Sequence, residues 1–496
     1  MERADAELMC ELLPTRPQPE IGKVLITGAT GYIGGQLVPA LLTRGYSVRI
    51  MVRAPSPELA HRWKNVEIVV ADAQSLGQVE MAMEGIDTAY FLIHSLLLGP
   101  EKLERVEIKV AENFRTAAEK KGVRRLIYLG GLGDEQGGHS THLRSRMAVG
   151  AALQQGPVPV TVLRAAIIIG AGSASYEILH HLVGKLPVIP IPSWARTRCQ
   201  PISIHDVILL LVGVLETPET VGQSFDIGGP DILSYEDMIR SMAAILGRRR
   251  WFPVSPPLPI KLTSYVISLL TPVPHAITWC LMEGVVNEVV CRNNRILDLI
   301  PFTPMTYRNA VLMAMTREEQ DRVHTRWSDA YPPAWELAIK LNELGTVPRY
   351  TTEYSLPTLK SAAVLFESIS RIGGDEGWFN SNWLWRLRGL LDRMFMGVGT
   401  SRGRRNQTQL RINDVVDFWR VEQLQPDAML LLRAEMKLPG RAWLRFTIEP
   451  GDHGNRLGVK AFFHTDRVWG KLYWYACLPF HHFIFNDLIR QIEKRS

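Results

Sequence analysis

The chain has 496 residues, more than one typical domain, so we expect two or three domains. Hydrophobic residues make up 46% and charged residues 21%, so a large core can form without metals or disulfides. The net charge of +6 is small for this length, and no nucleic-acid partner is predicted. The five cysteines show neither CxxC nor zinc spacing, which is typical of reduced thiols in a cytoplasmic protein; no metal site is predicted.

The N-terminal segment carries no targeting signal that we can identify. Residues 1–20 contain acids early and no apolar run of signal-peptide length, and we interpret them as a disordered lead-in. Every apolar stretch long enough to span a bilayer is broken by charge or proline. No transmembrane segment is therefore predicted.

Short apolar runs alternate with helical segments from residue 23 to about residue 165. Several runs lack polar alternation, as strands buried on both faces do. This rhythm predicts an α/β fold, a Rossmann doubly wound parallel sheet, with a mixed substrate-side lobe after residue 166 completing a domain over 21–345. The expected strands are 23–27, 47–52, 66–70, 87–93, 125–129 and 159–164.

A glycine-rich stretch, TGATGYIG (27–34), follows the first strand and opens a helix. Gly28 permits a tight turn, Gly31 lets the backbone approach a pyrophosphate, and Gly34 lets helix and strand pack closely. The amides at the start of that helix would face the phosphates. Thr30, Tyr32 and Ile33 complete this candidate nucleotide loop; the alternative is a structural turn that binds no nucleotide.

The tip of the second strand carries Arg53 and no acid. An acid there would bind a ribose 2′-hydroxyl, whereas the forked donors of an arginine suit a 2′-phosphate, so NADP is favoured over NAD. The alternative is a solvated arginine. Asp72, beyond the third strand, would either bind the adenine amino group or cap the next helix, and we include its neighbour Ala73 among the cofactor-binding candidates.

Beyond residue 350 the pattern changes to alternating apolar and polar residues. Segments 430–438, 442–448 and 457–463 alternate in this way, with turn residues between them, and a helical tail over 472–494 follows. This pattern predicts an α+β domain over 350–496, an antiparallel sheet with one buried face. Its aromatic residues would line an apolar pocket or fill a plain core: Trp419, Phe446, Phe463, Trp474 and Phe483.

The basic loop SRGRRNQ (401–407) lies beside the aromatic and basic helical segment 382–393. Such a surface would contact an anionic lipid or nucleic acid, or would simply be solvated. Peripheral membrane contact therefore stays open.

These motifs together resemble the atypical short-chain dehydrogenase/reductase superfamily, NmrA- and epimerase-like members included. The resemblance rests on TGATGYIG, Asp72, PISIHDV (201–207) and FDIGGPDILSYEDM (225–238), and on the branch motifs FLIHSL (91–96) and HLRSRMAVG (142–150). It implies an NAD(P)-binding fold, and Ile93 and His94 in FLIHSL join the cofactor-binding candidates. GGDEGWF (373–379) and LRAEMKLPGRAWL (432–444) resemble the branch's recurring C-terminal domain of unknown function, and a sheet wrapping a long helix resembles the helix-grip fold of START-like carriers.

The superfamily's oxidoreductases use a Tyr and a Lys four residues apart on one helix, with a Ser or Thr beyond the fifth strand. Here His142 and Arg146 stand at the paired positions, and Gly130 and Gly131 lie in the Ser region. His142 could serve as a general acid, and Arg146 could hold ribose hydroxyls but stays charged. The alternative is an i,i+4 pair on a partly exposed helix.

Two functions follow from this pattern. The first is an NADP-dependent oxidoreductase acting on a bulky apolar, lipid-like carbonyl or quinone; the intact lobe favours it slightly. The second is a non-catalytic NADP-binding sensor or assembly factor whose C-terminal domain contacts a lipid or protein partner; the missing Tyr favours it. A sugar-nucleotide epimerase is less favoured, because such enzymes depend on that Tyr.

Overall fold

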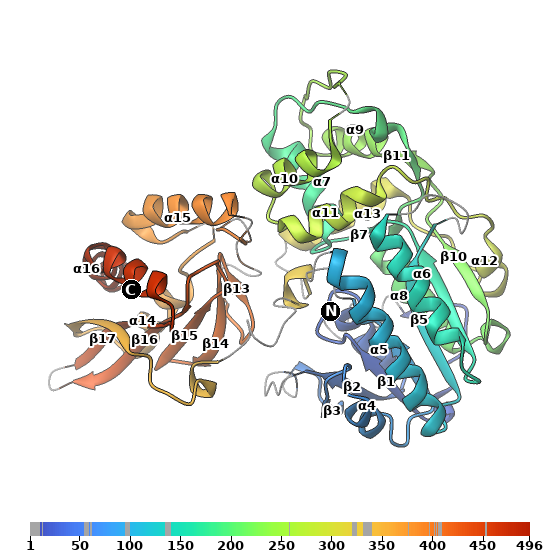
Figure 1. Ribbon diagram of the computed structural model, residues 1–496, viewed down its shortest axis with the longest axis horizontal. Coiled ribbons are helices and arrows are strands. Elements are labelled where there is room, and N and C mark those ends of the chain that lie inside the picture. The colour runs from blue at the N-terminus through green and yellow to red at the C-terminus, as the bar shows by residue number, and fades with distance from the viewer. Residues whose placement is uncertain are drawn as a thin grey trace. The chain divides into compact units, whose positions relative to one another are not determined.

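The computed structural model describes most of the chain, which divides into two compact units, residues 1–271 with 275–331, and residues 272–274 with 332–496 (Figure 1). Each unit is described by itself. The described residues are 10–11, 13–53, 59, 62–94, 100–133, 140–256, 258–319, 325–330, 340–374, 376–395, 397–400, 402, 404, 409–451 and 454–496.

A seven-stranded parallel sheet forms the centre of the first unit, in the order β10-β6-β5-β4-β1-β2-β3. The strand order reverses between β1 and β4, where ligands bind such sheets beyond the carboxyl ends of the strands. The predicted doubly wound sheet is confirmed, with β10 as an additional strand that the sequence pattern did not reveal. The strands are β1 (Lys23–Thr27), β2 (Ser47–Val52), β3 (Glu67–Val70), β4 (Thr88–Phe91), β5 (Arg125–Gly131), β6 (Val160–Ala165) and β10 (Ser224–Ile227).

Helices cover both faces of this sheet and create a core on each. Helices α2 (Gly34–Thr43) and α8 (Ile204–Leu215) pack on one face. Helices α4 (Leu76–Ala82), α5 (Pro100–Lys120) and α6 (Thr141–Gln154) pack on the other. In β1, Val24 and Ile26 belong to the first core and Leu25 to the second, which explains why the three central positions of the strand are all apolar.

A lobe of helices and short strands follows β6 and has its own core. That core includes Leu143 of α6, so the lobe is packed directly on the helix that carries the candidate catalytic pair. The lobe contains α7 (Ala174–Lys185), α9 (Tyr235–Ile245), α10 (Ile260–Leu270), α11 (His275–Gly284), α12 (Arg295–Leu299), α13 (Tyr307–Glu319), β7 (Ile168–Ile169), β8 (Arg198–Cys199), β9 (Ile202–Ser203) and β11 (Leu233–Ser234). Short 3-10 helices lie at Pro19–Ile21, Ser193–Arg196, Pro218–Thr220, Trp327–Ala330, Leu341–Glu343 and Phe379–Ser381.

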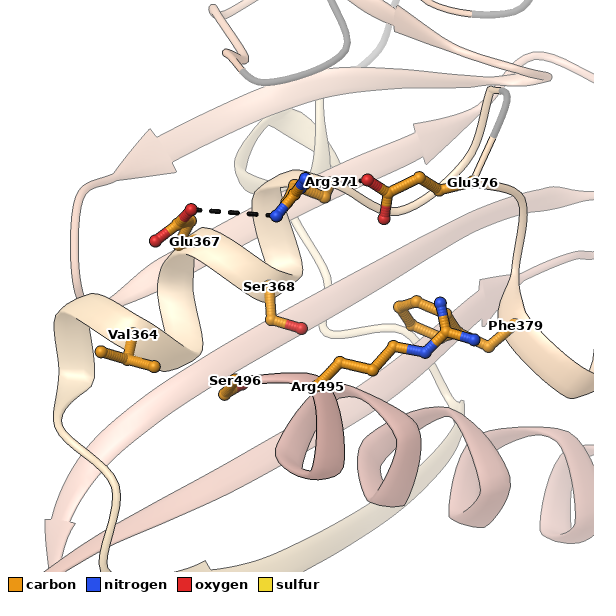
Figure 2. Close-up of a pocket in the computed structure, with 8 residues that line it drawn as sticks. All are labelled: Val364, Glu367, Ser368, Arg371, Glu376, Phe379, Arg495 and Ser496. Carbon is orange, nitrogen blue, oxygen red and sulfur yellow. Dashed lines mark hydrogen bonds and ion pairs between the residues drawn. The ribbon is translucent and has the colours of Figure 1, made fainter.

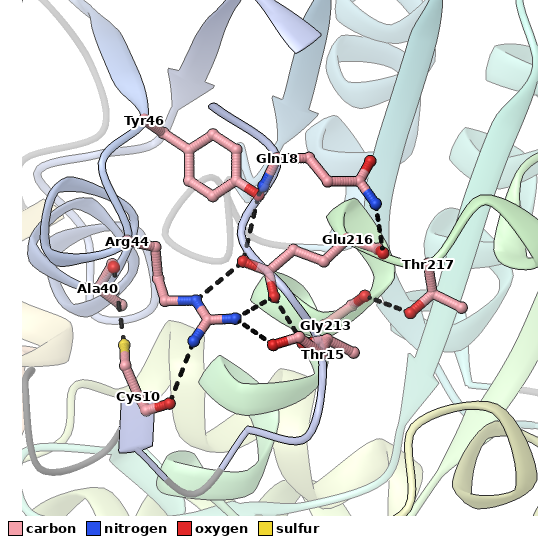
Figure 3. Close-up of polar contacts among 9 residues, drawn as sticks. All are labelled: Cys10, Thr15, Gln18, Ala40, Arg44, Tyr46, Gly213, Glu216 and Thr217. Atoms are coloured by element: carbon pink, nitrogen blue, oxygen red, sulfur yellow. Dashed lines mark hydrogen bonds and ion pairs between the residues drawn. The ribbon is translucent and has the colours of Figure 1, made fainter. Parts of the chain in front are cut away.

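The segment before β1 is anchored on a buried carboxylate, as Figure 3 shows. Glu216 accepts hydrogen bonds from the Thr15 hydroxyl, from the Arg44 guanidinium at 2.9 Å and from the Tyr46 hydroxyl at 3.1 Å. The Gln18 side chain donates to the Glu216 carbonyl at 3.1 Å. The expectation of a disordered lead-in is therefore wrong for residues 13–20, while residues 1–9 and 12 lie outside the described residues.

Replacing Glu216 with Gln is expected to destabilise the first unit by about 2 kcal/mol, because the nearly buried Arg44 loses its counter-charge. Thermal unfolding of the variant would measure this loss. Glu219, three residues further along and exposed, gives the matched control, and Glu219→Gln is expected to change stability by less than about 0.5 kcal/mol. Equal melting temperatures for the two variants would show that the anchor contributes nothing.

The second unit is an antiparallel six-stranded sheet in the order β12-β17-β16-β15-β14-β13. The predicted antiparallel sheet is confirmed, although its last helix begins at Val468 and not at residue 472. The strands are β12 (Tyr350–Thr358), β13 (Val415–Val416), β14 (Trp419–Gln425), β15 (Met429–Ala434), β16 (Arg441–Gly451) and β17 (Gly454–His464), with helices α14 (Ala362–Ser370), α15 (Asn382–Met394) and α16 (Val468–Arg495). In the part of the chain that the structure describes, no helix has the length and apolarity needed to cross a membrane.

The aromatic residues predicted to line a pocket or fill a core separate into two groups. Trp419, Phe446, Phe463 and Trp474 are buried, and the Trp474 ring stacks on Phe463 with 5.6 Å between ring centroids. Phe483 is 62% exposed, so its assignment to the interior is wrong. These contacts fit the plain-core alternative for the four buried residues.

A small pocket of about 100 Å³ lies between α14, the 3-10 helix at Phe379–Ser381 and the end of α16 (Figure 2). Both of its arginines have partners: Arg371 pairs with Glu376 at 3.0 Å, and Arg495 lies 4.4 Å from the centroid of the Phe379 ring.

The basic loop SRGRRNQ fits neither a lipid or nucleic-acid contact nor a solvated loop at two of its arginines, because Arg402 and Arg404 are buried. Its remaining residues, 401, 403 and 405–407, lie outside the described residues.

Candidate functional site

The glycine loop packs backbone against backbone. Gly28 has φ +67°, and a Cβ there would lie 2.6 Å from the Leu92 carbonyl oxygen at the end of β4. A Cβ on Gly34 would lie 2.4 Å from the Gly28 carbonyl oxygen, whereas one on Gly31 would lie 3.2 Å from it. Side chains at the first and last positions would therefore push the loop away from the strands, as expected of a tight phosphate-binding turn.

The start of α2 offers backbone donors beside this turn. Among the described residues, no hydrogen bond uses the amides of Thr30, Tyr32 or Ile33, which directly precede the helix. Free amides at a helix N-terminus suit phosphate oxygens. The Tyr32 side chain points elsewhere: its hydroxyl is buried beside Gly170, and burial raises its pKa. Tyr32 can thus bind a nucleotide only through its backbone.

Arg53 and Asp72 lie at the carboxyl ends of β2 and β3. Arg53 lies at the surface, where partial desolvation lowers the pKa of its guanidinium and the Asp72 carboxylate acts on that pKa in the opposite direction. Asp72 accepts a hydrogen bond from the Gln74 amide at 3.0 Å, which closes a turn before α4. The N-cap of α4 is Ser75, so Asp72 does not cap that helix. The neighbouring Ala73 is buried, and its carbonyl accepts from Asn113 of α5 at 3.1 Å.

Beyond β4, two imidazoles and a carboxylate form a hydrogen-bonded chain. Nδ1 of His94 lies 2.8 Å from Oε1 of Glu107 on α5. Nε2 of His94 lies 3.0 Å from Nε2 of His142 on α6. Ser145, also on α6, donates to the second Glu107 oxygen at 2.8 Å. The structure thus brings His94 and His142 together with Glu107, an acid that the sequence did not single out.

The partners fix the positions of the protons in this chain. A carboxylate can only accept, so His94 carries its proton on Nδ1, and its Nε2 accepts from Nε2–H of His142. Nδ1 of His142 is then left with a lone pair. Burial, together with the neighbouring His94 and Arg146, lowers the pKa of His142 to about 3. Burial also lowers the pKa of His94, so both rings are neutral at pH 7.

Arg146 is 6% exposed and its guanidinium is turned into the protein. It donates to the backbone carbonyls of Leu129 and Ile93, the latter at 3.4 Å, and lies 4.8 Å from the centroid of the Tyr128 ring. Those contacts rule out the alternative of an i,i+4 pair on a partly exposed helix. Through these two bonds Arg146 braces the ends of β4 and β5.

The position of Glu107 in the sequence could have predicted its buried contact. Val110, Ala111 and Phe114 follow it at the spacing of one helix face, and all three are buried. An acid at the first position of an apolar stripe is costly unless it is paired, and so it marks a buried polar contact. Ser145 had no comparable signal, because serine is common on any helix face.

Two family models match the chain, one in each unit. Residues 28–166 match the family described as NAD(P)H-binding. Residues 346–488 match the family described as Protein of unknown function (DUF2867). The first match covers the glycine loop and both histidines. This part of the chain is an NAD(P)-binding Rossmann domain.

Several curated proteins are similar to parts of the chain. The 3-beta-hydroxysteroid dehydrogenase of Mycolicibacterium neoaurum is 35% identical over 118 residues, 22% of this chain and 32% of that protein. The ceramide reductase of Caulobacter vibrioides is 26% identical over 230 residues, 46% of this chain and 72% of that protein. The photosystem II assembly factor Ycf39 of Trieres chinensis is 23% identical over 245 residues, 49% of this chain and 75% of that protein. The chain thus spans about a third of the steroid dehydrogenase's length.

Proposed function

We propose that this protein is an NADP-dependent oxidoreductase that interconverts an alcohol and a carbonyl on a bulky apolar substrate. The observation that carries the proposal is the Glu107–His94–His142 chain, which lies at the carboxyl edge of the sheet beside the glycine loop. The match to the NAD(P)H-binding family and the similarity to a steroid dehydrogenase and a ceramide reductase support a nicotinamide cofactor. The cofactor supplies hydride transfer when bound.

His142 takes the role of proton acceptor in alcohol oxidation. The substrate hydroxyl proton moves to Nδ1 of His142, the Nε2 proton of His142 moves to Nε2 of His94, and the Nδ1 proton of His94 moves to Glu107. This relay neutralises a buried carboxylate and creates no imidazolium beside Arg146, in keeping with the low pKa of His142. In carbonyl reduction the same protons move back.

The substrate class is proposed from the surroundings and from the relatives. The lobe packs on α6 through an apolar core, and two relatives are named for steroid and ceramide substrates.

Purified protein mixed with NADPH and a panel of long-chain ketones, enones and quinones tests the proposal. We expect consumption of NADPH, followed at its nicotinamide absorbance, with at least one member, and the reverse reaction with the corresponding alcohol. If NADPH binds but no member is turned over, the oxidoreductase assignment fails in favour of a binding role.

Arg53→Ala is expected to lower the preference for NADPH over NADH by about 1–3 kcal/mol, because a charge-assisted contact to the 2′-phosphate is lost. Titration of each nucleotide, followed by nicotinamide fluorescence, measures the preference. Arg105→Ala, on an exposed position of α5, serves as the control and leaves both affinities unchanged. An unaltered preference in Arg53→Ala would show that Arg53 does not contact the 2′-phosphate.

A second candidate function is a non-catalytic NADP-binding assembly factor or sensor. The burial of Arg146 favours it, because a buried guanidinium bonded to carbonyls replaces the usual Lys, and a relative is named as an assembly factor. The substrate panel separates the two functions, since only the oxidoreductase consumes NADPH.

A further inference from the structure

Helix α15 presents an apolar face that the second unit does not bury. Its inward positions, Trp385 and Gly389 among them, are buried. The exposed positions repeat at the spacing of one helix face, and they are Trp383, Leu387, Leu390, Leu391 and Met394. A globular protein seldom leaves so many large apolar side chains together in water unless they contact something.

Helix α16 repeats this arrangement. Trp474, Phe485 and Ile489 are buried, while Trp469, Leu472, Phe480 and Phe483 lie on one exposed face, Trp469 with 76% of its surface in water. Tyr473 of α16 is in electrostatic contact with Arg388 of α15, so the two helices are neighbours. We call their exposed residues the α15/α16 face.

The charges on the α15/α16 face have one sign. Arg386 of α15 and Lys471 of α16 are exposed; Arg467, just before α16, is exposed too, as is its neighbour Asp466. From residue 467 to residue 486 the sequence holds no Asp or Glu. The only acid of α15, Asp392, is turned inward, where it accepts from the Gly399 amide at 2.8 Å and the Lys437 amide at 2.7 Å.

We propose that the α15/α16 face binds the surface of an anionic lipid bilayer. Helices that lie in the bilayer interface have this composition: Trp, Leu and Phe are exposed on one face, Arg and Lys lie beside them, and the helix face carries no acid. A protein partner would need shape and polar groups matched to the face, whereas a lipid surface needs only apolar area and positive charge. This inference is independent of the proposed oxidoreductase activity.

Co-sedimentation of the full chain with vesicles tests this binding. We expect at least about tenfold stronger binding to vesicles of phosphatidylcholine mixed with phosphatidylglycerol than to phosphatidylcholine alone, because each basic residue near an anionic surface adds attraction. Raising the salt to about 0.5 M is expected to remove most of that difference by screening.

Two variants locate the bound surface. Trp469→Glu is expected to weaken binding to the mixed vesicles at least about tenfold, through loss of an inserted ring. Trp251→Glu, on a tryptophan of the first unit that is 67% exposed, is the matched control and is expected to bind as the wild type does. The double change Arg386→Glu with Lys471→Glu is expected to remove the preference for phosphatidylglycerol. Arg249→Glu, on an exposed arginine of the first unit, is expected to keep that preference.

Three outcomes would overturn the proposal. One is wild-type protein that stays in the supernatant with both kinds of vesicle. Another is equal weakening by Trp469→Glu and Trp251→Glu. The third is a wild-type dimer in gel filtration that Trp469→Glu converts to a monomer without vesicle binding, which would make a second copy of the chain the occupant.

Discussion

Replacing His142 with Gln is expected to lower kcat by about 10²–10⁴-fold, the range typical of a lost general acid or base, while NADPH affinity stays unchanged. Glutamine keeps a polar group near His94 but has no nitrogen that can take up a proton. The measurement pairs steady-state turnover with nucleotide titration. His181→Gln, on α7 of the lobe, is the matched control and is expected to retain kcat.

The pH dependence of the wild type gives an independent check on the relay. Because the pKa of His142 lies near 3, its ring stays neutral as the pH falls from 8 to 5. We therefore expect no break in kcat near pH 6.5, the ordinary range for histidine. A break there would mean that His142 works as an imidazolium, and unchanged turnover in His142→Gln would place the proton donor elsewhere.

The second large effect concerns Glu435, the acid at the centre of a buried arginine cluster. Its carboxylate accepts from Arg402 at 2.7 Å and from Arg420, and Arg433 lies 3.6 Å away. Glu435→Gln keeps the shape but leaves these guanidinium groups without their shared counter-charge. We expect a loss of about 3–5 kcal/mol from the free energy of unfolding of the second unit.

Urea unfolding followed by tryptophan fluorescence can measure this loss, because Trp378, Trp385 and Trp419 pack together in the same unit. Glu353→Gln is the matched control: Glu353 is exposed and pairs with Lys460 at 2.6 Å, and its loss is expected to cost under about 1 kcal/mol. Similar losses in the two variants would show that the buried cluster contributes no more to stability than an exposed ion pair does.

The same carboxylate sets a dependence of stability on pH. Burial by itself would raise the pKa of Glu435, but Arg420 and Arg402 outweigh it, and the pKa lies below its ordinary value. The stabilisation is therefore present above pH ~4.3, the unfolded value, and is lost as the pH falls through the folded pKa. Asp417 has the opposite effect on stability: burial raises its pKa to about 6, so its ionisation at higher pH lowers the stability of the folded state. The difference between wild type and Glu435→Gln is expected to shrink below pH ~4, because only the wild type loses this contribution there.

The sequence predicted those parts of the fold in which local pattern and burial agree. The β1 run KVLIT is apolar at its three central positions because the sheet is covered on both faces. The alternation in β16 and β17 predicted one buried face, but Leu431, Trp443 and Phe462 are buried on the other face as well, where Leu341 and Leu344 pack. β12 was missed, because YTTEYSLPT carries Thr, Glu and Ser where apolar residues would reveal a strand. β10 was missed because it is a short run at the sheet edge.

The candidate site was only partly predictable. The glycine loop is contiguous in the sequence, so its spacing revealed it. The relay joins residues from the end of β4, from α5 and from α6, and no local spacing relates His94, Glu107 and His142. The protonation of each ring depends on a carboxylate that only the fold brings into contact.

The strand order of the second sheet has a consequence for the order in which the chain is made. β12 leaves the ribosome first among these strands, yet it pairs with β17, roughly a hundred residues later. Until β17 has been synthesised, β12 has no partner, while β14, β15 and β16 can already form hairpins with one another. A nascent chain is thus exposed at β12 for the whole interval, and its Thr, Ser and Glu side chains protect that unpaired edge from joining other chains.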